Sequence, residues 1–461
     1  MKDHDVDVLV IGAGLSGLAL AHQLKRAGKS VRLLEAAPLA GGNIGTSSRH
    51  GFLLERGPNG FLAGEPAMGE LVESLKLGPQ LRSADLAAER RFVVRRGALV
   101  AVPQSPPDFL KSNLLPLHAK VRVLLEPLLA KRGPLRDESL GDFARRHVGR
   151  FATGTLVDAV QTGIYAGDVE KLSAGATFPK LKALESEHRS LLWGAFLEAR
   201  KKRQGAPEKS GPTLPRGLST FERGMGALTG ALTESLEAEL TLQFHVTSIW
   251  REEDGWRAEA SGQFPWSARR LVLATPTAMA SVLVGPHHSA LSEELSAIEY
   301  APLAVVHLAF KGDVPKGQRG FGFLVPSSEG LPLLGAIDVG ATFPFRVPDG
   351  HLLWTCLMGG ARAPELLRAM DDELVQQARA TLKGLVGELG QSVFSEVIRW
   401  PRAIPQYQLG HLARLQRIAN YLPDLPGLYL LGNGYEGVGV NDCVRTAKAL
   451  ADRMASEGAG P

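Results

Sequence analysis

Cysteine is almost absent from this sequence of 461 residues, which contains only Cys356 and Cys443. Two cysteines exclude a disulfide scaffold and a thiolate zinc site, and they suit a reducing compartment. Long uncharged apolar runs are also absent, so we expect no transmembrane helix. Acidic residues interrupt the N-terminal segment, which argues against a signal peptide. We therefore expect a cytoplasmic protein, and we leave open a peripheral contact with the inner face of the cell membrane.

Net charge is small as well. Lys and Arg together number 52, Asp and Glu number 48, and the formal charge is +4 at pH 7. This excess is too weak to indicate a nucleic-acid partner, but it is compatible with an anionic ligand or membrane surface. Hydrophobic residues make up 44% and charged residues 22%, which is typical of a folded globular protein. The length suffices for two or three domains.

The first 42 residues contain a complete pattern for a dinucleotide-binding unit. An apolar run ending at Ile11 precedes G-x-G-x-x-G, and a second apolar run ends at Glu35. Gly12 allows a tight turn, Gly14 lets the backbone approach a pyrophosphate, and Gly17 allows close helix–strand packing. The N-terminus of the following helix faces the phosphates, and Glu35 can accept hydrogen bonds from ribose hydroxyls. The sequence predicts a bound ADP moiety.

A second strand–glycine–helix segment occurs near the other end of the chain. Residues 427–434 have the pattern of a strand that enters a glycine turn, and a helix is expected from about Asn441 to Met454. Two such units predict one discontinuous nucleotide domain. The second helix N-terminus suits another polar part of a large cofactor, so FAD fits better than NAD.

The periodicity between these ends predicts the remaining organisation, in an α/β fold overall. A helical pattern extends from Ser105 to about Gln204, and alternating patterns flank it. We expect a discontinuous Rossmann-like FAD-binding domain formed by residues 1–85, 206–280 and 395–461. An α+β substrate-binding domain would comprise residues 86–104 and 281–394, and a helical insert would comprise residues 105–205.

Five blocks resemble the amine oxidase-like flavoprotein superfamily and, within it, the oxygen-dependent protoporphyrinogen IX oxidase family. The blocks span residues 57–60, 162–168, 320–326, 399–407 and 435–443, and they occur in the family's order over nearly the whole chain. The most specific are T-G-I-Y-A-G-D at 162–168 and Y-E-G-V-G-V-N-D at 435–442. The first glycine motif alone would not distinguish this family.

The resemblance implies a non-covalent FAD. In such proteins the first glycine loop holds the pyrophosphate, the residue matching Glu35 binds the ribose, and that matching Val246 meets the adenine. Trp400 would pack near the isoalloxazine, although an ordinary core tryptophan is the alternative. The cofactor-binding residues implied are Gly12, Ala13, Gly14, Leu15, Ser16, Gly17, Glu35, Ala36, Gly42, Asn43, Gly57, Pro58, Asn59, Gly60, Val246, Trp400, Val438, Gly439 and Val440.

The resemblance also implies a tetrapyrrole substrate with two propionates, which requires broad aliphatic walls and a cation. Arg91 matches the arginine that faces a propionate, although a surface arginine is the alternative and Arg90 lies beside it. The substrate-binding residues implied are Arg91, Gly163, Phe321, Leu324, Ile337, Leu357 and Asn59. At Leu357 plant and animal relatives carry a larger side chain, and at Asn59 animal relatives carry arginine.

The activity implied is oxidation of protoporphyrinogen IX to protoporphyrin IX, with O₂ reoxidising the flavin to give H₂O₂. Coproporphyrinogen III oxidation by the same fold is the alternative; an amine oxidase, a desaturase or a non-catalytic flavin-binding protein fits less well. We identify no metal cluster or nucleophile motif. We also assign no acid–base residue, because His147, His188, His245 and His307 are scattered along the sequence.

Within the helical insert, residues 114–117 (Leu-Leu-Pro-Leu) with Lys111, Lys120 and Arg122 resemble an interfacial membrane anchor. An ordinary packed helix is the alternative. The oligomeric state is left open, with a homodimer among the alternatives.

Overall fold

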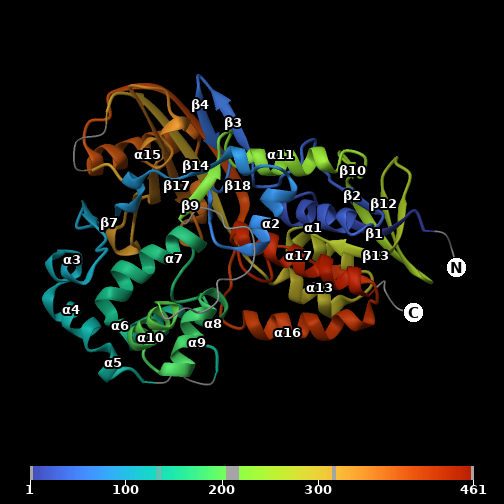
Figure 1. Cartoon of the computed structure of the whole chain (residues 1–461), viewed down its shortest axis with the longest axis horizontal. Coiled ribbons are helices and arrows are strands. Elements are labelled where there is room, and N and C mark those ends of the chain that lie inside the picture. The colour runs from blue at the N-terminus through green and yellow to red at the C-terminus, as the bar shows by residue number, and fades with distance from the viewer. Residues whose placement is uncertain (1–3, 132, 134–135, 204–216, 314–317, 458–461) are drawn as a thin grey trace.

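The computed structural model describes residues 4–131, 133, 136–203, 217–313 and 318–457. Figure 1 shows three regions: one sheet with its helices on the right, a second sheet at the upper left, and a helical region at the lower left. The blue N-terminal and red C-terminal segments lie together in the right-hand region. Both ends of the chain therefore build the same unit, as the two glycine motifs predicted.

The first sheet has the strand order β10-β2-β1-β13-β12-β11, with β19 beside β13. Strand β1 pairs in parallel with β2 and β13, and β13 pairs in parallel with β19. The paired parts of these four strands are mostly apolar and buried because helices cover both faces of the sheet. The strands are β1 (Val6–Ile11), β2 (Val31–Leu34), β10 (Leu240–Thr241), β11 (Val246–Glu252), β12 (Gly255–Ala260), β13 (Trp266–Leu273) and β19 (Leu428–Leu430).

Alternate residues of β1 enter different cores. Val8 and Val10 pack with the helices of one face, whereas Leu9 and Ile11 pack with those of the other. The first face is covered by α1 (Leu15–Arg26), α2 (Pro66–Ser74), α11 (Gly226–Ser235) and α17 (Val440–Ser456). The second face is covered by α12 (Thr277–Val284), α13 (Ser289–Ser296) and α16 (His411–Tyr421).

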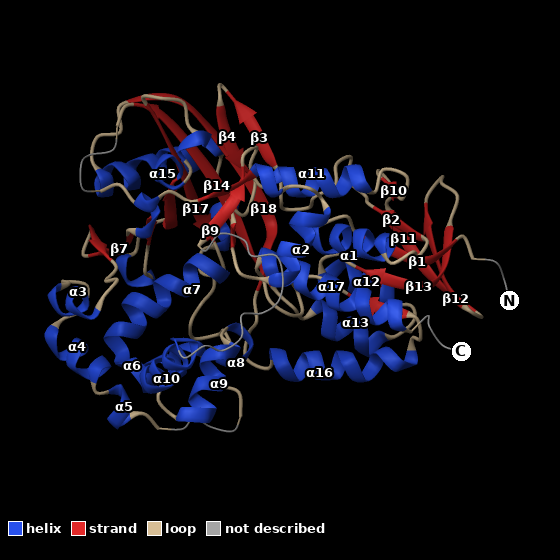
Figure 2. Ribbon diagram, in the orientation of Figure 1, coloured by secondary structure: helices blue, strands red, loops and turns tan. Residues whose placement is uncertain are grey.

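The second sheet has the order β18-β14-β17-β16-β15-β7-β8 and is antiparallel except where β15 meets β7 (Figure 2). Helix α15 (Asp371–Val386) packs on one of its faces. The strands are β7 (Arg91–Arg95), β8 (Ala98–Ala101), β14 (Tyr300–Lys311), β15 (Gly322–Leu324), β16 (Leu333–Asp338), β17 (His351–Gly359) and β18 (Gln391–Pro405).

Strand β18 joins this second sheet, although we expected residues from 395 onward to belong with the nucleotide fold. The expected boundary near residue 206 lies outside the described residues. The division into three domains therefore stays a prediction. Two small sheets complete the strands: β3 (Thr46–Arg49) with β4 (Phe52–Glu55), and β9 (Leu218–Phe221) between β5 (Phe61–Leu62) and β6 (Leu81–Ser83).

The expected helical insert is confirmed over the described residues. It contains α3 (Pro106–Lys111), α4 (Leu117–Leu124), α5 (Glu126–Leu129), α6 (Leu140–Ala152), the π-helical turn η3 (Thr153–Val157), α7 (Asp158–Tyr165), α8 (Ala174–Thr177), α9 (Pro179–His188) and α10 (Leu191–Arg203). Among the described residues, no helix is both long enough and apolar enough to cross a bilayer.

The expected membrane anchor is wrong in most of its residues. Leu114 and Leu115 are buried, and the Lys120 ammonium donates to the Leu110 carbonyl inside the insert. The Arg122 guanidinium donates to two carbonyls of α6. Of the apolar residues expected to contact the membrane, Leu117 is exposed, at 75%.

Candidate active site

The first glycine loop connects β1 to α1 at the carboxyl end of the parallel strands. Gly12 has φ +104°, a conformation that favours glycine. A Cβ on Gly17 would lie 2.0 Å from the Gly12 carbonyl oxygen, so the helix can approach the loop only because this residue is glycine. A Cβ on Gly14 would meet nothing within 4 Å. The loop is therefore tightly packed where Gly17 meets Gly12 and open where Gly14 lies.

Helix α1 begins in this open space without a side-chain cap. Gly14 is its N-cap residue and has no side chain, so among the described residues no side-chain cap accepts from the N–H groups of the first turn, which includes Leu15 and Ser16. Free N–H groups at a helix N-terminus attract phosphate. Nearby, the hydroxyl of Thr275 is buried without a hydrogen-bond partner among the described residues, and its backbone lies beside Gly12. The cradle fits a pyrophosphate.

Glu35 follows β2 at the same edge of the sheet. Its carboxylate accepts hydrogen bonds from the backbone N–H groups of Ala13 (2.7 Å) and Ala37 (2.8 Å). The Phe244 N–H donates to the Glu35 carbonyl at 2.8 Å, two residues before Val246 begins β11. The structure thus brings the predicted ribose and adenine residues, with exposed Ala36, to one end of the nucleotide loop.

The segments that follow Glu35 in the sequence pack against the same glycine loop. The Gly41 N–H donates to the Ala13 carbonyl, and a Cβ on Gly42 would lie 3.2 Å from the Gly14 Cα. A Cβ on Gly57 would lie 2.3 Å from the Asn43 carbonyl oxygen. The segments containing residues 42–43 and 57–60 therefore lie against each other and beside the nucleotide loop.

The C-terminal motif adds a second helix N-terminus. Helix α17 begins at Val440 after Gly439, whose N–H donates to the Asp442 carboxylate of the first turn at 3.2 Å. Because β19 and β1 both flank β13, α17 and α1 begin at the same edge of the sheet, where α/β folds bind ligands. The Asn441 amide donates to the Leu62 carbonyl and joins this turn, which includes Val438, to the segment after residues 57–60.

Trp400 lies on β18 of the second sheet, next to the segments described above. Its indole N–H donates to the Arg56 carbonyl at 2.7 Å, next to Gly57, and the indole is half-buried. The Asn43 amide donates to the Ala403 carbonyl on the same strand. The predicted cofactor segments therefore surround one space, with glycine loops and helix N-termini at one end and a flat aromatic surface at the other. This donor set fits FAD.

The predicted substrate residues lie on the second sheet and on α7, except for Phe321, which directly precedes β15, and Asn59, which lies between β4 and β5. A Cβ on Gly163 of α7 would lie 2.8 Å from the Leu324 side chain on β15, so helix and strand are in close contact. Gly335 of β16 pairs with both Leu324 and Leu357. Ile337 pairs with Gly322 in the next row. The structure brings these aliphatic residues together as one wall.

Arg91 continues this wall at its edge. It pairs with Gly322, is exposed, and places its guanidinium 5.6 Å from the centre of the Phe321 ring. On α7, Val160 and Ile164 flank Gly163 and are 45% and 42% exposed, although both are apolar. An apolar helix face and an apolar strand row thus lie beside a surface cation that forms no ion pair within the part of the chain that the structure describes, as a carboxylated apolar ligand requires.

The backbone of Asn59 is bonded to a buried ion pair that the sequence pattern did not identify. The Arg346 guanidinium donates to the Asn59 carbonyl at 3.2 Å and lies 2.7 Å from the Glu55 carboxylate. Burial raises the pKa of Glu55 despite the adjacent guanidinium. Nothing local distinguishes these residues from surface charges, since they are 291 positions apart (346 − 55).

His307 also lies within the second sheet. Its ring contacts the Thr355 hydroxyl and the Glu55 carbonyl, each at 3.1 Å. Burial lowers the pKa of His307 to about 4, so the ring is neutral at pH 7. Its contacts are those of a structural residue, and it still receives no acid–base role.

Comparison with known proteins agrees with this site. Residues 15–455 match the family described as flavin containing amine oxidoreductase. The chain is 32% identical to a chloroplastic protoporphyrinogen oxidase of Nicotiana tabacum, covering 98% of this chain and 85% of that protein. It is 29% identical to the coproporphyrinogen III oxidase of Bacillus subtilis (strain 168), covering 97% and 98% respectively.

A solved structure shares the whole fold. The crystal structure of a protein from Exiguobacterium sp. 255-15, provisionally named a protoporphyrinogen oxidase, superposes with a TM-score of 0.83 and 26% identity. The match covers 99% of this chain and 100% of that one. This chain therefore belongs to the flavin-containing amine oxidoreductase family and is an oxidoreductase with FAD as its cofactor.

Proposed function

We propose that the enzyme oxidises protoporphyrinogen IX to protoporphyrin IX with O₂ as the electron acceptor. The observation that carries this proposal is the apolar wall formed by Leu324, Ile337 and Leu357, with the Arg91 guanidinium at its edge. A porphyrinogen has the matching chemistry, because it is a broad apolar ring system with carboxylates along one side. The names of the Nicotiana tabacum relatives point to the same substrate.

Arg91 and the apolar side chains have different roles in this reaction. The Arg91 guanidinium would bind a propionate by two parallel hydrogen bonds. The aliphatic residues and the exposed apolar face of α7 would orient the macrocycle and exclude water. The chemistry that FAD supplies when bound is hydride acceptance followed by reoxidation with O₂, which yields H₂O₂.

Turnover of the purified holoenzyme tests the substrate. Protoporphyrinogen IX added in air should give porphyrin fluorescence and H₂O₂ above the spontaneous rate. Arg91→Ala should raise KM by roughly tenfold with little change in kcat, because it removes a contact made equally before and during the reaction. The matched control is Arg90→Ala, whose guanidinium lies over Phe92 instead. No stimulated fluorescence with any porphyrinogen would refute the function.

Coproporphyrinogen III is a second candidate substrate, because the Bacillus subtilis relative carries that name and covers the chain almost completely. The two substrates differ at the ring edge, where vinyl groups replace two of the carboxylates. Comparing kcat/KM for the two porphyrinogens on the same preparation decides between them. A higher value for coproporphyrinogen III would assign that reaction to the chain.

We further propose that the enzyme contacts the inner face of the cell membrane through α4 and α5. These helices expose Leu117, Val121, Leu124 and Leu128, at 75%, 46%, 53% and 79%. The exposed Lys111 would favour anionic lipid. Flotation with vesicles of anionic phospholipid should carry the protein at low salt, and Leu124→Asp/Leu128→Asp should abolish it. Phe264→Asp, at a 93% exposed position outside these helices, is the control.

A further inference from the structure

Helix α7 has an exposed apolar side and a buried polar side. Val160 and Ile164 are exposed, whereas Asp158, Gln161 and Thr162 are buried at 1%, 0% and 2% exposure. A buried carboxylate is costly unless hydrogen bonds and opposite charge compensate for it. The partners of Asp158 therefore show what this side of the helix is attached to.

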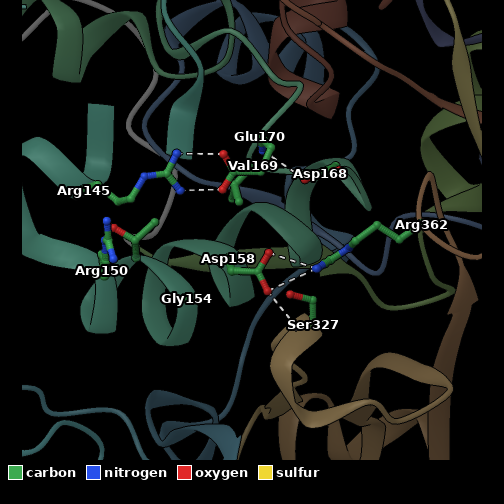
Figure 3. A pocket seen from close by; sticks show the side chains of 10 residues that line it. Arg145, Arg150, Gly154, Asp158, Asp168, Val169, Glu170, Ser327 and Arg362 are labelled. Atoms are coloured by element: carbon green, nitrogen blue, oxygen red, sulfur yellow. Dashed lines mark hydrogen bonds and ion pairs between the residues drawn. The ribbon is translucent and has the colours of Figure 1, made fainter. Parts of the chain in front are cut away.

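Asp158 is bonded to two strands of the substrate wall (Figure 3). One carboxylate oxygen accepts the Ser327 N–H at 2.6 Å, three residues after Leu324 on the same segment. Both oxygens accept from the Arg362 guanidinium, at 3.0 and 3.2 Å. Arg362 follows β17, five residues after Leu357. One carboxylate thus joins α7 to the strands that carry two aliphatic wall residues.

A second set of bonds closes the network. The other guanidinium nitrogen of Arg362 donates to the Thr162 hydroxyl, which directly precedes Gly163. The Gln161 amide donates to both Asp158 (3.2 Å) and Thr162 (3.0 Å). Arg362 therefore binds α7 at two points, one turn apart, immediately behind the residue that touches Leu324.

We propose that Asp158 and Arg362 are positioning residues that set the width of a substrate slot bordered by α7 and by the wall of Leu324, Ile337 and Leu357, an inference that rests on the proposed function. The ion pair holds α7 at one distance from β15 and β17. The contact between Gly163 and Leu324 is already close, so the helix can move only away from the wall. Without the ion pair the slot widens, and the macrocycle is held less firmly against the flavin.

The same region supplies a matched control. An open pocket of about 450 Å³ is lined by Asp158, Arg362 and Ser327 on one side and by Arg145 and Glu170 on the other. Arg145 lies 2.5 Å from Glu170 and joins α6 to the segment after α7 (Figure 3). This second ion pair touches neither β15 nor β17, so removing it perturbs charge in the pocket without releasing the slot wall.

The test compares Asp158→Asn, Arg362→Met and the milder Thr162→Val with Glu170→Gln, all as holoenzymes. KM and kcat are measured for protoporphyrinogen IX and coproporphyrinogen III. For Asp158→Asn and Arg362→Met we expect KM to rise by about fivefold or more and the kcat/KM ratio of the two substrates to change about threefold or more. Thr162→Val, which keeps the ion pair, should shift both quantities in the same direction by a smaller factor. FAD content and the flavin spectrum should stay at the wild-type values. Glu170→Gln should keep the wild-type KM and ratio.

Amide hydrogen exchange supplies a readout that is independent of turnover. The amides of α7 should exchange faster in Thr162→Val and Asp158→Asn than in Glu170→Gln. If Arg362→Met does not fold, Asp158→Asn decides, with Thr162→Val as the milder variant that leaves the ion pair in place. Unchanged KM, substrate ratio and α7 exchange in the folded variants would overturn the inference. If the wild-type enzyme oxidises neither porphyrinogen, the proposed function fails and this inference fails with it.

Discussion

The dinucleotide unit and the helical insert are held together by different interactions. Around the first sheet the core is apolar, and residues such as Val10, Leu18 and Leu228 have no exposed surface. The insert instead buries charge: Glu126 and His147 have no exposed surface either. An apolar core tolerates small shifts in geometry, whereas a buried charge requires each partner in place. The comparison predicts that the two regions respond differently to mutation and to pH.

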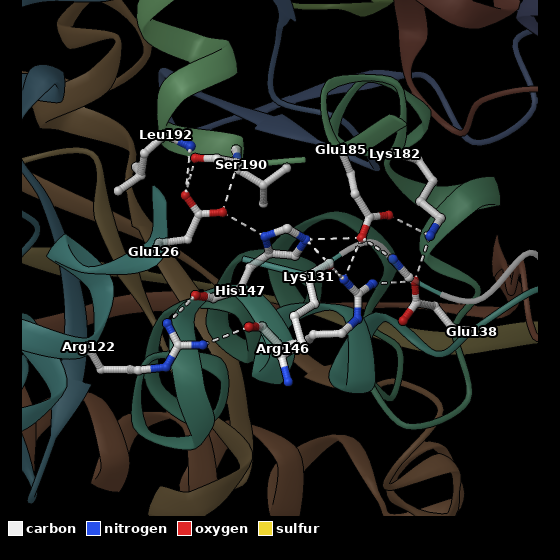
Figure 4. A network of polar contacts seen from close by, with 12 residues as sticks. Arg122, Glu126, Lys131, Glu138, Arg146, His147, Lys182, Glu185, Ser190 and Leu192 are labelled. Atoms are coloured by element: carbon white, nitrogen blue, oxygen red, sulfur yellow. Dashed lines mark hydrogen bonds and ion pairs between the residues drawn. The ribbon is translucent and has the colours of Figure 1, made fainter. Parts of the chain in front are cut away.

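The insert's ion network joins α5, α6, α9 and α10 (Figure 4). The His147 ring on α6 contacts Glu126 of α5 at 2.7 Å and Glu185 of α9 at 3.2 Å. Glu126 also accepts the Ser190 hydroxyl and the N–H groups of Leu191 and Leu192, which begin α10. One carboxylate therefore satisfies the N-terminus of one helix and the imidazole of another.

The other end of the network is a cluster of two carboxylates and two cations. Arg146 and Lys182 each pair with both Glu138 and Glu185. Burial alone would raise the pKa of Glu185, but hydrogen bonds from Lys182, Arg146 and His147 outweigh it and lower the pKa to about 2. The pKa of Glu126 is also lowered, because its hydrogen bonds outweigh burial.

The largest effect is expected in the dinucleotide unit, from Gly17→Ala. Its Cβ would overlap the Gly12 carbonyl oxygen at 2.0 Å, so helix α1 must move away from the loop that is predicted to hold the pyrophosphate. FAD affinity should fall by at least ~100-fold, and the purified protein should be colourless. Flavin absorbance per protein, followed by titration with added FAD, measures this.

The matched variant is Gly14→Ala, whose Cβ meets no atom of the protein within 4 Å. Its unfolding free energy without cofactor should stay within about 0.5 kcal/mol of the wild type. FAD affinity should nevertheless fall, because the methyl group enters the space in front of the loop. Wild-type affinity in Gly14→Ala would show that the pyrophosphate binds elsewhere.

Next in size is Glu126→Gln in the insert. The Glu126 carboxylate takes part in four hydrogen bonds, two on each oxygen, and the amide nitrogen that replaces one oxygen is a donor and cannot accept from the groups that face it. Breaking a buried charge network in this way costs about 3–5 kcal/mol. Urea unfolding of the holoenzyme followed by far-UV circular dichroism measures the loss. FAD content should not change, and a concurrent loss of flavin would show that the insert and the nucleotide unit unfold together.

The contrast also explains what the sequence could predict. The nucleotide loop, Glu35 and the C-terminal glycine turn were identified because each is a local pattern of apolar runs and glycines. The network around Asp158 was not, since Arg362 lies 204 positions away and neither residue has a distinctive neighbourhood. Several residues expected in the membrane anchor are buried for a related reason: the sequence pattern does not reveal which side chains bond inside the protein, and the Lys120 ammonium donates to the Leu110 carbonyl.

A smaller and purely apolar loss is expected from Leu382→Ala. Leu382 lies on α15, is fully buried, and packs against the second sheet with Leu374, Ala378 and Leu385. Removing its side chain leaves a cavity and should cost about 3 kcal/mol. No ionisable group is involved, so the loss should be equal at pH 5 and pH 8 by urea unfolding. A pH-dependent loss would mean that charges of the sheet also contribute.

The smallest loss of stability is expected from Glu185→Gln, and its pH dependence distinguishes the insert most clearly from the apolar sheet. At pH 7 the variant should be less stable by about 2 kcal/mol, because Arg146 and Lys182 keep Glu138 as a partner and are partly solvated.

The folded protein holds the pKa of Glu185 at about 2, below its ordinary value of 4.5. The stabilisation is therefore complete above about pH 4.5 and is lost as the pH falls toward 2, since the unfolded chain takes up the proton first. Urea unfolding at pH 7, 5, 4 and 3 should show a constant difference between wild type and variant down to about pH 5 and a shrinking one below it. A difference that stays constant to pH 3 would mean that Glu185 acts through packing, as Leu382 does.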